Sequence, residues 1–138
     1  MKHDSIAIMI KLASTDFDKQ SNQALAPFDM TNSQYKVLKY ILTKPELSVR
    51  QIDIENYFSM SNPTVTGLLQ NMEKHGLIER AVNPEDKRSK VIRVTDKVRA
   101  EETELIRLGT EMEDRFTQNL SDEEKQQMKE LLRKLLGE

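Results

Sequence analysis

Small and polar side chains recur along one side of the stretch from Ser61 to Leu77, where a glycine stands among amide, hydroxyl and ammonium groups. Such groups can hydrogen-bond to the base edges and phosphate oxygens of a nucleic acid, and a glycine lets the backbone approach closely. A solvent-facing helix would more usually carry Glu and Lys at these positions. The residues on this side are Pro63, Gly67, Gln70 and Lys74, flanked by Thr66 and Asn71.

A short helix over residues 61–75 accounts for this spacing. Ser61 or Asn62 can cap its free amides, and Pro63 suits the first turn because its missing N–H is not needed there. Gly76 can follow the helix in the left-handed conformation. The opposite side is apolar at a period of about 3.6 residues and is expected to be buried. Taken alone, the stretch could equally be an ordinary amphipathic helix with a tolerated glycine.

A charged β-hairpin is predicted directly after this helix. Residues 77–82 and 90–94 have the composition of strands, and turn-forming and charged residues fill positions 83–89 between them. A solvated charged turn is the commoner explanation of such a run in isolation. The position of the hairpin directly after the polar helix over residues 61–75 favours contact with nucleic acid instead. The basic residues along the hairpin are Arg80, Lys87, Arg88, Lys90 and Arg93.

Three helices are predicted before these two elements, from apolar residues at helical spacing and from start signals. The first covers residues 5–25 and is ended by Pro27, the second opens at a capping box (Thr31–Gln34) and stops before Pro45, and the third opens at another capping box (Ser48–Gln51) and runs to Phe58. The third helix and the helix over residues 61–75 are joined by a tight break, which is typical of a helix-turn-helix. A small helical hairpin of another kind is the alternative.

Two more helices are predicted after the hairpin. Thr95–Asp96 can cap a long fifth helix that reaches Phe116, and a third capping box, Ser121–Glu124, starts the last helix. The small middle module cannot cover the apolar faces of these helices and of the first one, so we expect them to pack against a second copy of the chain. The residues expected in that contact are Ile6, Met9, Ile10, Met112, Phe116, Met128, Leu131, Leu132 and Leu135.

These elements predict a mainly α fold with a small β-hairpin. We expect a DNA-binding domain over residues 31–95, between an N-terminal helix in residues 1–30 and C-terminal helices in residues 96–138 that together form a dimerisation region. The length of 138 residues suits one such domain with added oligomerisation helices. A hydrophobic content of 37% makes the core thin for this length, which also favours burial between subunits.

Composition argues against several classes of function. The chain has no Cys, which excludes disulfides, thiolate metal sites and thiol redox sensing. His3 and His75 are far apart in the sequence, so we expect no metal and no cofactor. A Gly-rich phosphate loop, a nucleophile elbow and a His–Glu metal pair are all missing, so we do not expect an enzyme. The apolar run Ile6–Ile10 is too short for a membrane span or signal peptide, and we expect a cytoplasmic protein.

Charge is distributed unevenly along the chain, although the net charge is only −2. Residues 61–99 hold eight basic and five acidic side chains, a net charge of +3, whereas residues 100–138 hold six basic and eleven acidic side chains, a net charge of −5. The charge of one face, rather than the total, decides phosphate binding. The basic middle third therefore fits nucleic acid better than the whole chain does.

Five short motifs resemble the MarR family of bacterial winged helix-turn-helix regulators, in order and with the family's spacing. They are residues 30–34 (MTNSQ), 61–66 (SNPTVT), 72–80 (MEKHGLIER), 86–89 (DKRS) and 94–95 (VT). The most specific is Asp-x-Arg-Ser in the hairpin, followed by a strand rich in β-branched residues that ends in Thr. The resemblance covers essentially the whole chain. The sequence departs from common family patterns at Glu55, at Ser59 and after Thr95, where small residues or glycines are frequent.

The resemblance implies a winged helix-turn-helix in each subunit of a homodimer with interlocked terminal helices, bound to a pseudo-palindromic operator in double-stranded DNA. The helix over residues 61–75 would enter the major groove, Arg88 would reach into the minor groove with Asp86 holding it, and Ser89 would contact phosphate. In the family, small aromatic or other amphipathic ligands often bind between the dimer helices and the winged module, so we expect a repressor that such a ligand relieves. The residues expected to bind DNA are Ser61, Asn62, Pro63, Thr64, Thr66, Gly67, Gln70, Asn71, Lys74, Asp86, Lys87, Arg88 and Ser89.

A winged-helix module that binds protein rather than DNA is the alternative function. The acidic C-terminal third and the low total charge allow it. Binding to duplex DNA at low salt distinguishes the two, because contacts to phosphate weaken steeply as salt rises.

Overall fold

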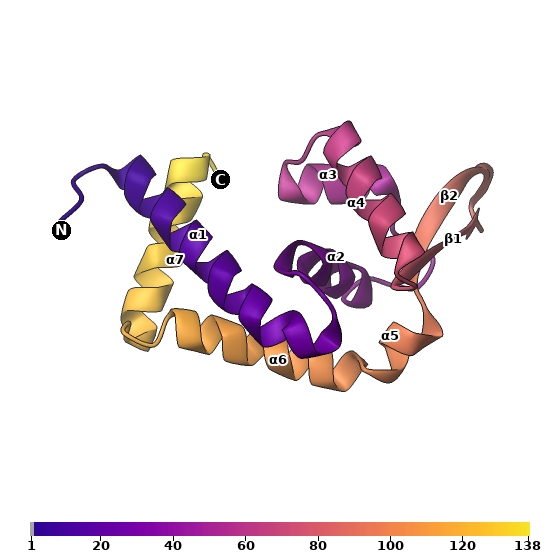
Figure 1. Cartoon of the computed structure of the whole chain (residues 1–138). Helices are drawn as coiled ribbons and strands as arrows, with labels where there is room; N and C mark the ends of the chain where they lie inside the picture. Colours follow the sequence, from indigo (N-terminus) through magenta and orange to yellow (C-terminus); the bar gives the residue numbers. More distant parts are fainter. Residues whose placement is uncertain (1) are drawn as a thin grey trace.

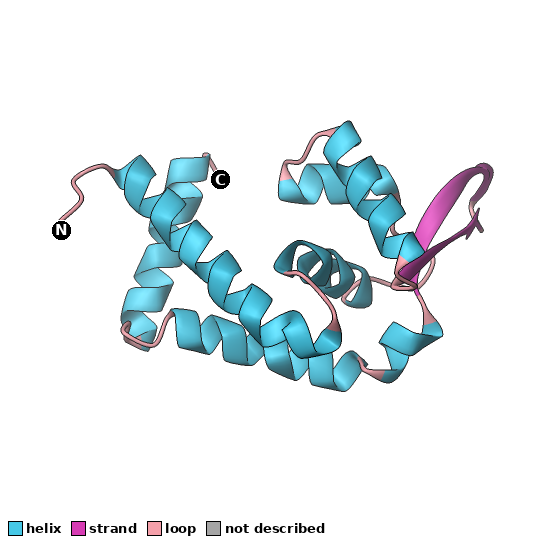
Figure 2. Ribbon diagram, viewed as in Figure 1, coloured by secondary structure: helices cyan, strands magenta, loops and turns pink. Residues whose placement is uncertain are grey.

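The computed structural model describes residues 2–138, which form two parts joined by short connections. In Figure 1 the terminal helices α1 (Ile6–Leu25), α6 (Glu102–Phe116) and α7 (Asp122–Leu136) form one part. The second part consists of α2 (Asn32–Leu42), α3 (Gln51–Phe58), α4 (Asn62–Lys74) and the projecting strands β1 (Ile78–Asn83) and β2 (Asp86–Val94). The connections include a 3-10 helix, η1 (Ala26–Phe28), and α5 (Asp96–Ala100). Figure 2 shows the predicted mainly α fold with one small hairpin, which is confirmed.

Two capping boxes start helices where the sequence predicts them. At α2, Thr31 Oγ1 accepts a hydrogen bond from Gln34 N at 3.3 Å, and Gln34 Oε1 accepts one from Thr31 N at 3.0 Å. Ser121 and Glu124 make the same reciprocal pair at the start of α7. Each pair satisfies two backbone amides that a helix start would otherwise leave open, which explains why this local signal is reliable.

The capping box predicted at Ser48–Gln51 is wrong. Ser48 Oγ donates instead to the carbonyl oxygen of Pro45 at 2.6 Å. The helix does not begin there because Val49 is buried and pairs with the hairpin, its carbonyl oxygen accepting a hydrogen bond from Ile92 N of β2 at 2.8 Å. The helix α3 begins two residues later, and the carboxylate of Asp53 accepts the backbone N–H of Arg50 at 2.9 Å.

The single long helix predicted after Thr95 is also wrong. The chain forms the short helix α5, breaks at Glu101 (φ −101°, ψ 8°) and resumes as α6. Thr95 does not cap α5 through its side chain, because its Oγ1 donates to the carbonyl oxygen of Gly76 at 2.7 Å. Val98 of α5 and Leu105 of α6 are both buried in the core, on either side of the break.

One hydrophobic core runs through both parts of the chain. Its most deeply buried side chains come from the helices α1 to α6 and from β2, and they include Leu25, Leu38, Ile54, Leu69 and Leu105. Each such side chain contributes about 1.5 to 3 kcal/mol by leaving water. This shared core holds the helix-turn-helix against the terminal helices.

Two residues expected at the contact between subunits are covered within their own chain, Met112 almost completely and Phe116 in part. Met112 is only 7% exposed and belongs to the core of its own chain, so its assignment to the dimer contact is corrected. Phe116 is half-buried against Phe17 of α1, with the ring centroids 4.8 Å apart and the rings edge to face. Both residues continue the apolar stripe of α6, and α1 covers that stripe within one chain.

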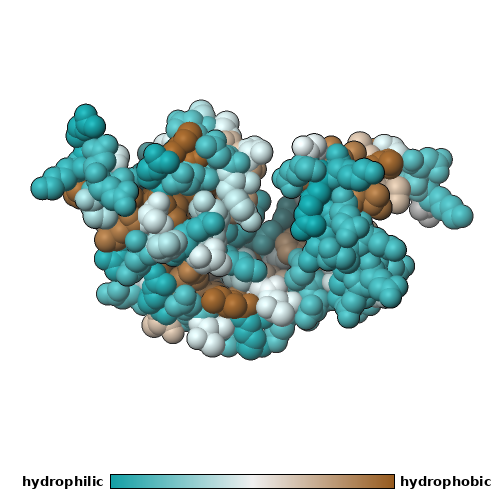
Figure 3. All heavy atoms as spheres, turned by 180° about the vertical axis from the view of Figure 1, so that it is seen from behind, coloured by the Kyte–Doolittle hydropathy of each residue, from teal (hydrophilic) through white to brown (hydrophobic). Residues whose placement is uncertain are grey.

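The remaining expected dimer residues are exposed. They lie on α1 and α7, and α7 has no buried residue at all. Figure 3 shows hydrophobic surface at the end of the molecule that carries these helices. No helix within residues 2–138 is both long and apolar enough to cross a membrane. The exposed set is Ile6, Met9, Ile10, Met128, Leu131, Leu132 and Leu135.

Ser59→Gly is expected to raise the free energy of unfolding by about 1 kcal/mol, because Ser59 adopts the left-handed conformation that glycine accepts without steric cost. Its φ is 52°, and its backbone N–H already donates to the carbonyl oxygen of Glu55. Urea unfolding monitored by circular dichroism measures the change. Ser33→Gly, at an exposed position inside α2, is the control and should lower the free energy of unfolding. A loss of stability in Ser59→Gly would contradict the assignment of strain to this turn.

Candidate nucleic-acid interface

Glu55 of α3 braces the turn between α3 and α4, at a position where a small residue is more usual. The carbonyl oxygen of Glu55 accepts a hydrogen bond from Met60 N at 3.0 Å, and its carboxylate accepts one from Asn62 Nδ2 at 2.9 Å. Ser61 Oγ caps α4 by accepting from Thr64 N at 3.4 Å. The departure from a small residue at position 55 therefore adds a bond across the turn. It fixes the direction in which α4 leaves α3.

The outward face of α4 makes almost no contact with the rest of the chain. Pro63, Gly67, Gln70 and Lys74 are exposed, whereas the opposite side of the helix is buried. A Cβ built on Gly67 would have no atom within 4 Å, so packing inside the chain does not require a glycine there. Glycine in the middle of a helix costs about 1 kcal/mol relative to alanine. Gly67 has this cost and no packing role within the chain, so its small size leaves room for another molecule to approach α4.

Three expected DNA-binding residues also tie α4 to its neighbours. Thr66 is half-buried, and its Oγ1 accepts a hydrogen bond from Gln51 Nε2 at 2.8 Å. Asn71 Oδ1 accepts one from Gln34 Nε2 at 2.7 Å, and Asn62 is bound to Glu55 as described above. The partners Gln34 and Gln51 belong to other helices, α2 and α3, and the spacing of residues within α4 does not predict them. Gln34 carried one signal, its place in a capping box, which gave no hint of a contact with α4.

The hairpin is tighter than predicted. The strands pair antiparallel from Ile78 opposite Val94 to Val82 opposite Lys90, and the next pair is Asn83 opposite Asp86. Residues 84–85 form the turn, so the expected loop over residues 83–89 is wrong and residues 86–89 belong to β2. The register shift leaves residues 87–89 as a bulge near the tip. Bulges of this kind redirect side chains away from the regular pleat.

The bulge is built by hydrogen bonds that orient an arginine. Asp86 Oδ1 accepts from the backbone N of Arg88 at 3.0 Å and from its Nε at 3.2 Å. The Arg88 side chain is nevertheless 90% exposed, so its guanidinium keeps most of its donors free. Ser89 Oγ donates to the carbonyl oxygen of Asp86 at 3.2 Å and accepts from Asn83 Nδ2 at 3.0 Å. Ser89 thus shapes the tip, whereas Lys87 and Arg88 are exposed on it.

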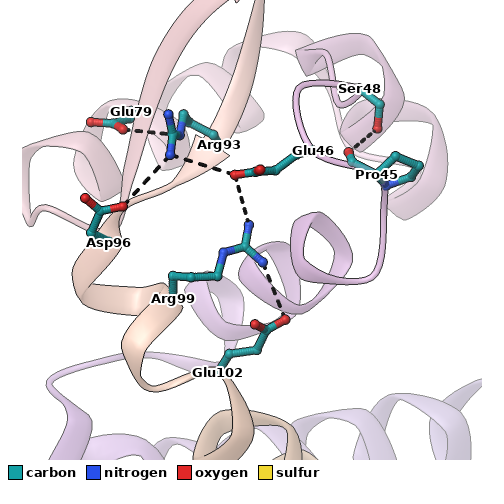
Figure 4. Close-up of polar contacts among 8 residues, drawn as sticks. All are labelled: Pro45, Glu46, Ser48, Glu79, Arg93, Asp96, Arg99 and Glu102. Carbon is teal, nitrogen blue, oxygen red and sulfur yellow. Dashed lines mark hydrogen bonds and ion pairs between the residues drawn. The ribbon is translucent and has the colours of Figure 1, made fainter.

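Carboxylates neutralise the basic residues at the base of the hairpin. Figure 4 shows Arg93 between Glu79, at 3.3 Å, and Glu46, at 3.8 Å. Arg99 of α5 shares Glu46 at 3.6 Å, and Arg80 is paired with Glu73 of α4 at 2.8 Å. Partly exposed pairs of this kind are each worth at most about 1 kcal/mol, but a network fixes geometry. On the hairpin, the positive charge available to a partner is therefore concentrated toward the tip.

A cavity of about 560 Å³ lies between the two parts of the chain. Its lining combines aromatic rings with ammonium groups and with the carboxylates of Glu113 and Asp114, and Figure 3 shows the surface hollowed between the two parts. The rings of Tyr40 and Tyr57 lie 4.7 Å apart in it. Burial, helped by the negative charge of Asp53, raises the pKa of Tyr40, so its phenol stays protonated near neutral pH. The lining includes Phe17, Lys36, Lys39, Tyr40, Tyr57 and Lys129.

Within residues 2–138 no group of three or more His, Asp or Glu side chains is placed to hold a metal ion. The surface described above can instead donate hydrogen bonds and present positive charge. Both suit the acceptor-rich edges and phosphates of a duplex.

Comparisons with known proteins agree with this geometry. The profile of the MarR family matches residues 30–90. The HTH-type transcriptional regulator YwoH of Bacillus subtilis is 29% identical over 118 residues, which are 86% of this chain and 84% of that protein. A crystal structure of an S. aureus MepR–DNA complex superposes with a TM-score of 0.87, at 31% identity and with 98% of each chain covered. A MarR variant from E. coli crystallised with operator DNA has a TM-score of 0.83 and 26% identity, covering 95% of this chain and 93% of that one.

Proposed function

The chain belongs to the MarR family, whose members are DNA-binding transcriptional regulators and not enzymes, and we propose that it acts as a homodimeric repressor of a pseudo-palindromic operator. The observation that carries this proposal is the outward face of α4, which is polar, exposed and free of packing around Gly67. Two relatives were crystallised with DNA, and one of these complexes contains operator DNA. Both complexes support the same mode of binding for this chain.

In the proposed complex, α4 enters the major groove. Gln70 then hydrogen-bonds to base edges, and Lys74 neutralises a phosphate without reading sequence. Arg88 enters the adjacent minor groove, where a narrow groove carries the most negative potential. Asp86 limits the directions that the guanidinium can take, which lowers the conformational entropy lost on binding.

The exposed apolar faces of α1 and α7 form the contact with the second subunit. Two copies joined there present two α4 helices, and the half-sites of a duplex are about 34 Å apart, one helical turn. A pseudo-two-fold operator follows from a two-fold dimer. The acidic C-terminal third then lies in the dimer contact and away from phosphate.

The cavity between the two parts suits a small aromatic anion. Its rings can stack on the ligand, and Lys36, Lys39 and Lys129 can pair with a carboxylate. A ligand there contacts α2 and α3 on one side and α6 and α7 on the other. It therefore favours one spacing of the two α4 helices, and a spacing that no longer matches the half-sites relieves repression.

Arg88→Ala is expected to weaken binding to the operator by about 10- to 100-fold, because it removes the minor-groove cation and leaves the fold unchanged. The operator is first obtained by selecting bound fragments from the source genome at a stated salt concentration. Fluorescence anisotropy titrations then compare wild type and variant. Arg115→Ala, which removes an exposed arginine of α6, is the matched control and should bind as wild type does. Equal affinity of wild type and Arg88→Ala would contradict the role of the hairpin tip, and selection of no preferred sequence would contradict the proposed function.

A further inference from the structure

We propose that Gln34 is a positioning residue that sets the direction of the Asn71 amide, so that Asn71 presents only N–H donors to the duplex. This inference rests on the proposed docking of α4. It concerns a contact between two residues that are 37 positions apart in the sequence. Asn71 then binds acceptor atoms, such as a phosphate oxygen or the O6 and N7 of guanine, and it does not form the two-way pair that asparagine makes with adenine.

The direction of the two amides follows from one fixed donor. A backbone N–H can only donate, and Thr31 N donates to the side-chain oxygen of Gln34 at 3.0 Å. The nitrogen of Gln34 must therefore point the other way, toward α4. It meets the side chain of Asn71 at 2.7 Å, and only the oxygen of Asn71 can accept there. Asn71 is exposed, and among residues 2–138 its side chain makes this one hydrogen bond, through its oxygen, so its Nδ2 remains available as a donor.

The surroundings hold Gln34 still. Its side chain is 7% exposed, and the start of α2 is bound to α1 at two points. Asn32 N donates to Asn22 Oδ1 at 2.7 Å, and Asn32 Nδ2 donates to Asp18 Oδ1 at 2.8 Å. Asn71 itself lies at the edge of a surface hollow that Gln34, Thr31 and Asn22 also line, so its free nitrogen is accessible. The buried amide of Gln34 therefore has one orientation that satisfies both Thr31 and Asn71.

Gln34→Glu tests the direction because it reverses a single group. The glutamate keeps the capping box, since its carboxylate still accepts the N–H of Thr31. It has no proton for Asn71, so the Asn71 amide must turn and donate its Nδ2 to the carboxylate. Asn71 then presents its oxygen to the duplex, where it faces other hydrogen-bond acceptors and cannot bind them.

We expect Gln34→Glu to weaken binding to the selected operator about tenfold. The added negative charge is controlled by a double-mutant cycle with Asn71→Ala. In the Asn71→Ala background the same charge is added but no amide can turn, so Gln34→Glu should have little further effect. Equal weakening in both backgrounds would overturn the proposal. So would an Asn71→Ala variant that binds as tightly as wild type, because Asn71 would then present nothing to the duplex.

A measurement without DNA separates this inference from the proposed function. In ¹⁵N-labelled protein, the side-chain amide protons of Gln34 should exchange slowly with solvent and those of Asn71 rapidly. In Gln34→Glu the Asn71 amide should become the slow one. An Asn71 amide that is unchanged by Gln34→Glu would overturn the inference even if the protein binds its operator. The expected reversal, found in a protein that selects no sequence, would support the direction that Gln34 sets for the Asn71 amide, and would remove the proposed function together with the contact to the duplex.

Discussion

Gly109→Ala is expected to lower the free energy of unfolding by about 3 kcal/mol, because α2 and α6 cross at this glycine without room for a methyl group. A Cβ built on Gly109 would overlap the phenol oxygen of Tyr35. That oxygen donates to the carbonyl oxygen of Leu105 at 2.6 Å, in a buried site. Burial raises the pKa of Tyr35, so the hydroxyl remains a donor at neutral pH. The variant must either strain the crossing or break this buried hydrogen bond.

Urea unfolding measures the loss, and two variants isolate its cause. Gly67→Ala, at the other glycine within a helix, has open space for its Cβ and should raise the free energy of unfolding by about 1 kcal/mol. Tyr35→Phe removes the oxygen that overlaps the new methyl group. Gly109→Ala should therefore lower the free energy of unfolding by less in the Tyr35→Phe background than in the wild type. A Gly109→Ala variant as stable as wild type would show that the crossing of α2 and α6 can accommodate a methyl group, and would contradict the prediction.

Local signals explain which elements could be predicted from the sequence. The start of α2 at Thr31, the start of α7 at Ser121 and the left-handed Gly76 depend on residues within one turn, and all three were predicted correctly. The two faces of α4 also follow from its own period. For the same reason the helix-turn-helix and the hairpin were recognisable as a unit before any tertiary contact was known.

The errors have tertiary causes. The helix α3 starts late because Val49 pairs with β2, and Thr95 does not cap the next helix because its hydroxyl donates to the carbonyl oxygen of Gly76. Met112 looks like part of an exposed stripe until α1 covers it. In the candidate site, the bulge that orients Arg88 depends on register, and the partners of Thr66 and Asn71 come from other helices. No periodicity within one segment contains this information.

Leu131→Asp is expected to convert the protein to a monomer and to weaken operator binding by about 100-fold or more, because one subunit then holds one half-site without its partner. Leu131 lies on α7 in the exposed apolar face, and its side chain is 65% exposed within a single chain. The aspartate would have to lose its water of hydration against the apolar residues of the second copy, at a cost of several kcal/mol. The subunit's own core is untouched, so the helix content should persist.

Light scattering after gel filtration gives the oligomeric state at micromolar concentration, and anisotropy gives the affinity. Gln126→Asp adds the same charge to α7 two residues before the exposed Met128, outside the apolar set, and should remain dimeric and bind DNA as wild type does. A Leu131→Asp variant that stays dimeric would place the contact between subunits elsewhere. A wild-type protein that is monomeric and still binds its operator tightly would remove the dimer from the proposed function, since nothing would then tie two α4 helices to half-sites one turn apart.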